Sequence, residues 1–173
     1  MDKRPVISEI DPDKASDDIK KIISDHLAQG YQLTGEKRTL LHNGPAFNAV
    51  EGGSYAVAKE LEKHIGRRAA IFFEYAVSEE NECIVCVTYY RNLLRKNNID
   101  LENLEYTPQE ELLVEYGRAI GRNPKDISDE LFERLKEVFS EEEIVVITAM
   151  GVMMVANNYF NDILRVKPDR LVG

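Results

Sequence analysis

Apolar residues recur along this chain at the three- and four-residue intervals that place them on one face of a helix. Ile19, Ile22, Ile23 and Leu27 follow this spacing, and Gly30 ends the helix that they predict. Similar patterns predict further helices in the first half of the chain over residues 36–42, 45–65, 67–77 and 81–94. Within the second of these, the pair Gly52-Gly53 predicts a kink.

Capping boxes mark helix starts in the second half of the chain. In such a box, a hydroxyl residue is followed three positions later by a glutamate, as in Thr107 with Glu110 and Ser140 with Glu143. Gly121 is expected to end the helix that Thr107 begins. The helices predicted in this half cover residues 107–120, 128–139 and 140–165.

These elements predict an all-α fold in a single domain. The runs 69–73 and 84–88 contain β-branched residues, but helix formers surround them and no hairpin turn follows, so we interpret them as helical. The 173 residues suffice for one domain with a sizeable core. We expect a helical extension over 1–34 and a helical bundle over 35–173, whose two halves are connected by 97–107.

The most apolar stretch, residues 144–160, is interrupted by Asn157 and Asn158 and falls short of a membrane span. Its central part, 145–155, is apolar nearly all round, which predicts burial on more than one side and hence a homo-oligomer. Together with Asn161, the asparagines are expected to lock helices or subunits together by hydrogen bonds rather than to bind a ligand.

The net charge of −9 and the absence of a basic stripe argue against a nucleic-acid partner. No apolar signal segment is found at the N-terminus, so we expect a cytoplasmic protein whose thiols are kept reduced.

The chain has only two cysteines, and they stand in the motif Cys83-Ile84-Val85-Cys86. Positions i and i+3 share a helix face, so the two sulfurs can meet and form a disulfide with little backbone movement. In a cytoplasmic protein, such a pair is typical of redox chemistry or metal binding rather than of a permanent cross-link.

The residues around the cysteine pair are expected to have opposite effects on the pKa of Cys83. If Asn81 caps the helix, Cys83 lies in its first turn, where unpaired N–H groups favour a thiolate. Three nearby carboxylates would raise the pKa of the thiol: Glu79, Glu80 and Glu82.

Two other interpretations of the cysteines remain open. They can be buried residues that act as small hydrophobes. Zinc is less favoured because it needs four ligands, and His26, His42 and His64 lack paired ligand spacing. We therefore predict neither a metal nor a cofactor.

Three segments, in this order, resemble the carboxymuconolactone decarboxylase and alkylhydroperoxidase D-like superfamily. They are residues 40–45, which end in a proline before a long helix, the C-x-x-C at 83–86, and the closing helix at 139–161 with its asparagines. Together they cover most of the chain after residue 35, and only the C-x-x-C is specific by itself.

The resemblance implies an all-helical, oligomeric protein of the alkylhydroperoxidase D-like type. It also implies that Cys86 reacts with a peroxide or disulfide substrate and that Cys83 resolves the product as a disulfide. A thiol or dithiol partner would then reduce that disulfide.

The chain departs from the family pattern in the proton relay. Tyr90 stands where the pattern has a histidine, and Ile71 stands where it has a glutamate. Tyr90 is too weak a base to replace histidine as an acceptor but can donate a hydrogen bond. Glu74, one turn after Ile71, is a candidate for the missing carboxylate, and His42 is a candidate for approaching the thiols from another helix.

Three functional hypotheses follow. The first is a thiol-dependent oxidoreductase that uses Cys83 and Cys86, either peroxidase-like or disulfide-exchanging. The second is a non-catalytic oligomeric protein that has lost the relay. The third is a lactone decarboxylase-like enzyme, against which the two cysteines argue because that chemistry does not need them.

Overall fold

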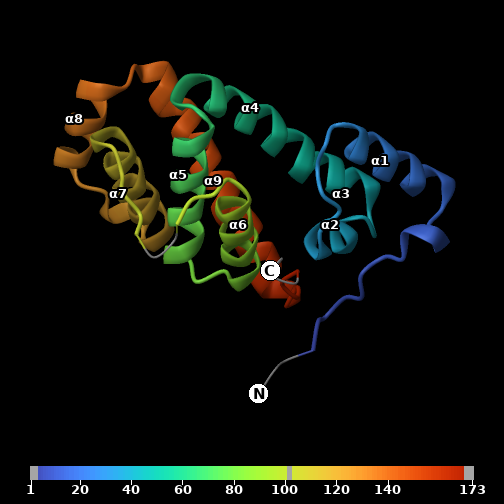
Figure 1. Cartoon of the computed structure of the whole chain (residues 1–173). Coiled ribbons are helices and arrows are strands. Elements are labelled where there is room, and N and C mark those ends of the chain that lie inside the picture. Colours follow the sequence, from blue (N-terminus) through green and yellow to red (C-terminus); the bar gives the residue numbers. More distant parts are fainter. Residues whose placement is uncertain (1–3, 101–102, 170–173) are drawn as a thin grey trace.

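The computed structural model describes residues 4–100 and 103–169, and every regular element within them is helical (Figure 1). The predicted all-α fold is therefore confirmed for the described part of the chain. Of the predicted connection 97–107, residues 101–102 lie outside the described residues. The longer helices are α1 (Asp17–Ala28), α4 (Gly53–Ile65), α5 (Arg67–Glu80), α6 (Ile84–Lys96), α7 (Pro108–Arg122), α8 (Asp129–Val138) and α9 (Glu141–Leu164). The short elements are η1 (Pro12–Lys14), α2 (Gly35–Leu40), α3 (Gly44–Phe47), η2 (Asn48–Gly52) and η3 (Pro124–Asp126).

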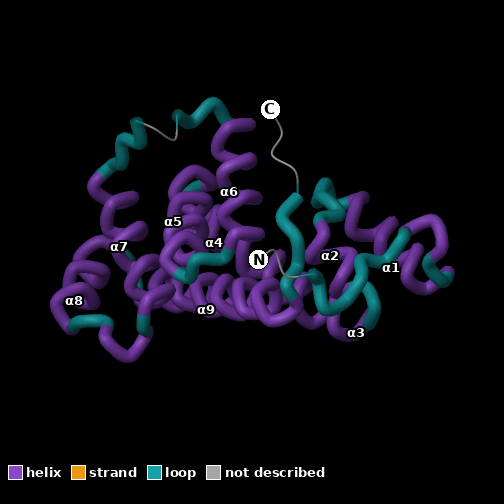
Figure 2. Tube along the Cα trace, turned by 90° about the horizontal axis from the view of Figure 1, so that it is seen from below, coloured by secondary structure: helices purple, strands orange, loops and turns teal. Residues whose placement is uncertain are grey.

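The helices surround two hydrophobic clusters. The larger one is built mainly by α5, α6, α7 and α9, and the smaller one by α1, α2 and α3. In Figure 1 the first group forms the bundle and the second lies to one side of it, joined to it by α4. Figure 2 shows α9 running along the bundle from α8 toward the N-terminal helices, where Phe160 packs against both clusters.

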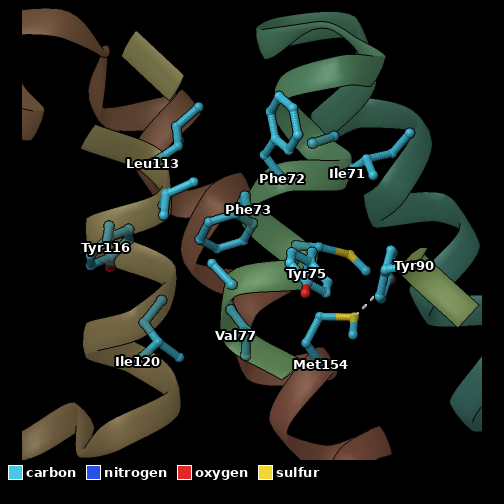
Figure 3. Packing of buried hydrophobic residues seen from close by; sticks show 14 of the residues in the cluster. Ile71, Phe72, Phe73, Tyr75, Val77, Tyr90, Leu113, Tyr116, Ile120 and Met154 are labelled. Atoms are coloured by element: carbon cyan, nitrogen blue, oxygen red, sulfur yellow. Dashed lines mark hydrogen bonds between the residues drawn. The ribbon is translucent and has the colours of Figure 1, made fainter. Parts of the chain in front are cut away.

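Helix α5 lies at the centre of the bundle and is buried on nearly all sides. Its extensive contact with α7, seen in Figure 3, requires glycines at the closest approach. A Cβ at Gly117 would lie 2.8 Å from the carbonyl oxygen of Phe73, and one at Gly121 would lie 2.7 Å from that of Val77. The prediction that Gly121 ends a helix is therefore wrong, because α7 continues to Arg122 and uses this glycine for packing.

The boundary between α5 and α6 also differs from the prediction. The polar residues after Val77 remain helical because Ser78 is fully buried and its hydroxyl bonds the carbonyl oxygen of Glu74. Asn81 is the C-cap of α5 rather than the start of α6, and its side chain bonds the carbonyl oxygen of Gly121 at 2.6 Å. Cys83 consequently becomes the N-cap of α6.

The segment around Gly52-Gly53 is a widened helical turn rather than a simple kink. Residues Asn48–Gly52 form a π-helix between α3 and α4, so the chain stays helical from Gly44 to Ile65. Such turns occur frequently at functional sites. Here the π-helix places Glu51, which is 1% exposed, inside the protein.

Helix α9 begins at the capping box of Ser140 and Glu143, and the box of Thr107 and Glu110 begins α7, both as predicted. Asn158 locks α9 to the α5–α6 junction because its amide donates to Asn81 and its oxygen accepts from Ser78. The predicted inter-helix role of this asparagine is thus confirmed.

Among the described helices, α9 alone is long and apolar enough to cross a membrane, with a mean hydropathy of 1.4 over its most apolar part. A core helix can have the same composition, and one face of α9 packs against α4 and α5. Its other face is exposed and carries four large apolar side chains: Val145, Val152, Tyr159 and Ile163.

Candidate thiol site

The structure brings the two cysteine sulfurs together at the start of α6. Both are free thiols, and they lie close enough for each to shift the pKa of the other. The side chain of Cys83 is fully buried, whereas Cys86 keeps 6% of its surface exposed. The two residues are therefore neighbours, with Cys83 at the N-cap of α6 and Cys86 in its first turn.

The surroundings at the start of α6 shift the pKa values of the two thiols in opposite directions. The hydrogen bond from Cys86 lowers the pKa of Cys83 most, burial opposes it, and the N–H groups of Cys86 and Val85 lower the pKa further. The same hydrogen bond raises the pKa of Cys86, and burial and the nearby Glu36 raise it further. The first negative charge of the pair therefore belongs to Cys83.

The glutamates that precede the motif in the sequence are not the main influence on the pKa of Cys83. Glu79 accepts a hydrogen bond from Tyr75 at 2.9 Å, and Glu80 is paired with Arg122 at 2.6 Å. The carboxylate that raises the pKa of Cys83 is Asp162, which belongs to α9.

Glu74 and Tyr90, both buried, are brought together by α5 and α6. Burial raises the pKa of Glu74 to about 8, against the lowering effect of its hydrogen bond with Tyr90. At neutral pH Glu74 is therefore mainly protonated and can donate to the Tyr90 oxygen. The Tyr90 hydroxyl then donates to the sulfur of Met154 at 3.3 Å (Figure 3).

The Glu74–Tyr90 pair lies close enough to the thiols for charge on Cys86 to raise the pKa of Tyr90. Ile71, at the position of the family's glutamate, is a buried apolar residue. His42 is placed differently, because its side chain is exposed and its ring nitrogen lies 2.7 Å from the carbonyl oxygen of Ser8.

Two residues at the site were not among those predicted from the sequence. The amide of Asn161, on α9, donates to the Cys86 sulfur at 3.4 Å, and Glu36, on α2, lies close enough to Asn161 for this side chain to influence its pKa. An asparagine in an apolar helix signals a buried partner, but the pattern does not say which one. Glu36 belongs to a short polar helix and gives no signal in the sequence.

Within residues 4–100 and 103–169, no group of three or more histidine, cysteine, aspartate or glutamate side chains is arranged to hold a metal ion. The sequence matches no protein-family model, and no curated protein matches it.

Solved structures do match this arrangement of helices. One is an uncharacterized peroxidase-related protein with an alkylhydroperoxidase AhpD core from Ralstonia eutropha JMP134. It aligns over 96% of this chain and 94% of its own, with a TM-score of 0.70 and 18% sequence identity. The fold is that of the alkylhydroperoxidase D-like proteins.

A second match is an uncharacterized peroxidase-related protein from Silicibacter sp. TM1040. It covers 96% of this chain and 93% of its own, with a TM-score of 0.71 and 14% identity. The predicted resemblance in fold is thus confirmed, and the chain shares this fold with peroxidase-related proteins.

Proposed function

We propose that this protein is a thiol-dependent peroxidase of the alkylhydroperoxidase D-like type, in which Cys83 and Cys86 alternate between dithiol and disulfide. The observation that carries the proposal is the nearness of the two free thiols at the start of α6, where each shifts the pKa of the other. Neighbouring sulfurs are the requirement for a disulfide that forms and breaks with little backbone movement. The similarity to peroxidase-related proteins supports a peroxide as the oxidant.

The reaction begins with loss of one proton from the sulfur pair. Transfer of the remaining proton from Cys86 to the neighbouring Cys83 puts the charge on Cys86, the residue of the two that retains some exposure. The Cys86 thiolate attacks a peroxide oxygen, so that an S–O bond forms and the O–O bond breaks. The leaving oxygen takes a proton from the Glu74–Tyr90 pair, because Tyr90 lies near Cys86 and Glu74 is mainly protonated at neutral pH.

The second step closes the disulfide. The Cys83 sulfur attacks the sulfenic acid on Cys86, the S–S bond forms, the S–O bond breaks, and the oxygen leaves as water with the Cys83 proton. A dithiol reductant then exchanges with the disulfide and is itself oxidised to a disulfide, which restores both thiols. His42 has no part in these steps, because its ring is engaged with Ser8.

One observation favours a second candidate, a non-catalytic scaffold. The pKa of Cys86 is raised, and a buried thiol that stays protonated is inert.

Measuring catalytic turnover distinguishes the peroxidase from the non-catalytic scaffold. With a small dithiol as reductant, the wild-type protein should consume hydrogen peroxide catalytically, faster than the same concentration of free thiol. A C83S/C86S double variant is the control. Equal rates for the two proteins would exclude a peroxidase.

The exposed apolar face of α9 supports a homo-oligomer as part of this proposal. Val145, Val152 and Tyr159 recur at seven-residue intervals, the spacing of a helix–helix seam. V152D should lower the molar mass measured by light scattering to that of a single chain, since a buried aspartate opposes association. V138D is the matched control because Val138 is also exposed but lies on α8. An unchanged mass for V152D would contradict the proposal.

We also propose a cytoplasmic location, where thiol reductants are available.

A further inference from the structure

The N-terminal helices carry a buried network of charges toward the thiols. The ammonium group of Lys37, on α2, lies 2.6 Å from a carboxylate oxygen of Glu51 on the π-helix and 3.4 Å from one of Glu36. All three side chains are largely removed from solvent. One ammonium group between two buried carboxylates leaves an excess of negative charge whenever both carboxylates are ionised.

Two buried oxygens at the inner end of this network have no hydrogen-bond partner. They are Oε1 of Glu36 and Oδ1 of Asn161. Buried polar atoms without a partner are rare, and each one needs a physical explanation. Both belong to side chains that lie beside each other, and the Asn161 amide donates to the Cys86 sulfur at 3.4 Å.

A proton on Glu36 would give both oxygens a hydrogen-bond partner. The protonated carboxyl can donate to Asn161 Oδ1, which holds the side chain of Asn161 with its amide directed at the sulfur of Cys86. An ionised Glu36 cannot donate and leaves Asn161 Oδ1 without a partner, and its charge opposes a thiolate on Cys86. Burial also raises the pKa of Glu36 and so favours its protonated form.

We propose that Glu36 is a positioning residue for the thiol pair and that, through Asn161, its protonation favours the thiolate form of Cys86. The inference rests on the proposed function in that it concerns the same thiols, but it makes a separate claim about their ionisation. The N-terminal helices thereby take part in the site: they supply a carboxyl group whose protonation is coupled to ionisation of Cys86.

Other titratable groups also face this region. Lys37 and Glu51 act on Glu36 from its own side, and Cys86 faces it from α6. Tyr89, on α6, and Tyr55, on α4, lie beside this network, and Asp162, on α9, acts on Cys83. A test must therefore change Glu36 alone and keep its size.

E36Q meets this requirement because glutamine imitates the protonated acid and can donate to Asn161 Oδ1. The measurement is the pH dependence of alkylation at Cys83 and Cys86 separately, followed by mass spectrometry of the fully reduced protein. In E36Q the midpoint for Cys86 should move to lower pH. Each unit of displacement corresponds to about a tenfold faster reaction at pH values below the midpoint. E110Q is the matched control, since Glu110 is also buried but is paired with Arg68.

A purely structural effect of the substitution would look different. General loosening would accelerate both thiols at every pH without moving the midpoint, and that result would overturn the inference. So would a midpoint equal to that of E110Q. Should E36Q fail to fold, E36D keeps the ionisable carboxyl but shortens the reach to Asn161, so its Cys86 midpoint should lie above that of the wild type. An unchanged midpoint in E36D overturns the inference as well. Because alkylation needs no turnover, lack of peroxidase activity would refute the proposed function without affecting this result.

Discussion

Replacing Cys86 by serine is expected to abolish peroxide reduction, and replacing Cys83 by serine should stop the reaction after one equivalent of peroxide. A serine hydroxyl is almost never ionised near neutral pH, so the loss in C86S should be about 10³-fold or more. In C83S the sulfenic acid on Cys86 has no resolving thiol and should persist. The measurement is rapid-mixing peroxide consumption, combined with trapping of the sulfenic acid and mass spectrometry.

Serine is close to cysteine in size, so both variants should keep the wild-type fold, and circular dichroism provides the control. The opposite pattern, with C83S inactive and C86S stopping after one equivalent, would reverse the two roles. That result would mean that the lower pKa of Cys83 outweighs the greater exposure of Cys86. Full activity in both variants would exclude the cysteine pair from the reaction.

Replacing Glu74 by glutamine is expected to change the pH dependence of stability. The pKa of Glu74 is about 8 in the folded protein and 4.5 as the ordinary value, so between these values the folded state holds a proton that the unfolded state has released. Stability from this group is complete below pH 4.5 and is lost as pH rises through 8. Each pH unit costs about 1.4 kcal/mol, which amounts to roughly 3–5 kcal/mol in total.

The free energy of unfolding of the wild-type protein, from urea titrations, should therefore fall more steeply between pH 5 and pH 8 than that of E74Q. The difference between the two proteins isolates Glu74 because all other titrating groups are shared. Parallel curves would show that Glu74 is ionised in the folded state, and they would remove it as the acid that protonates the leaving oxygen.

Much of the fold was predictable because local signals and tertiary packing agree. The capping boxes at Thr107 and Ser140 begin α7 and α9 as predicted. The predictions were wrong where packing overrides local preference. Gly121 is a helix breaker by propensity, but it allows α7 to contact the backbone of α5. The polar residues after Val77 suggested a break, but Ser78 is buried and hydrogen-bonded within α5.

The site was predictable only in its local part. The spacing of Cys83 and Cys86 implied neighbouring sulfurs, and one helical turn between Ile71 and Glu74 was enough to suggest the latter as a carboxylate. Asn161 and Glu36 reach the site from α9 and α2, far away in sequence. Such contacts depend on how helices pack, which periodicity alone does not determine. The same holds for His42, which the fold directs toward Ser8.

The most direct test of the account is titration of the reduced, folded protein with hydrogen peroxide, followed by intact mass and peptide mapping. One equivalent should convert both thiols into a Cys83–Cys86 disulfide, with a mass decrease of about 2 Da from the loss of two hydrogens. A dithiol should then restore both thiols. Persistence of both free thiols in the folded protein, with oxidation only after denaturation, would contradict the account.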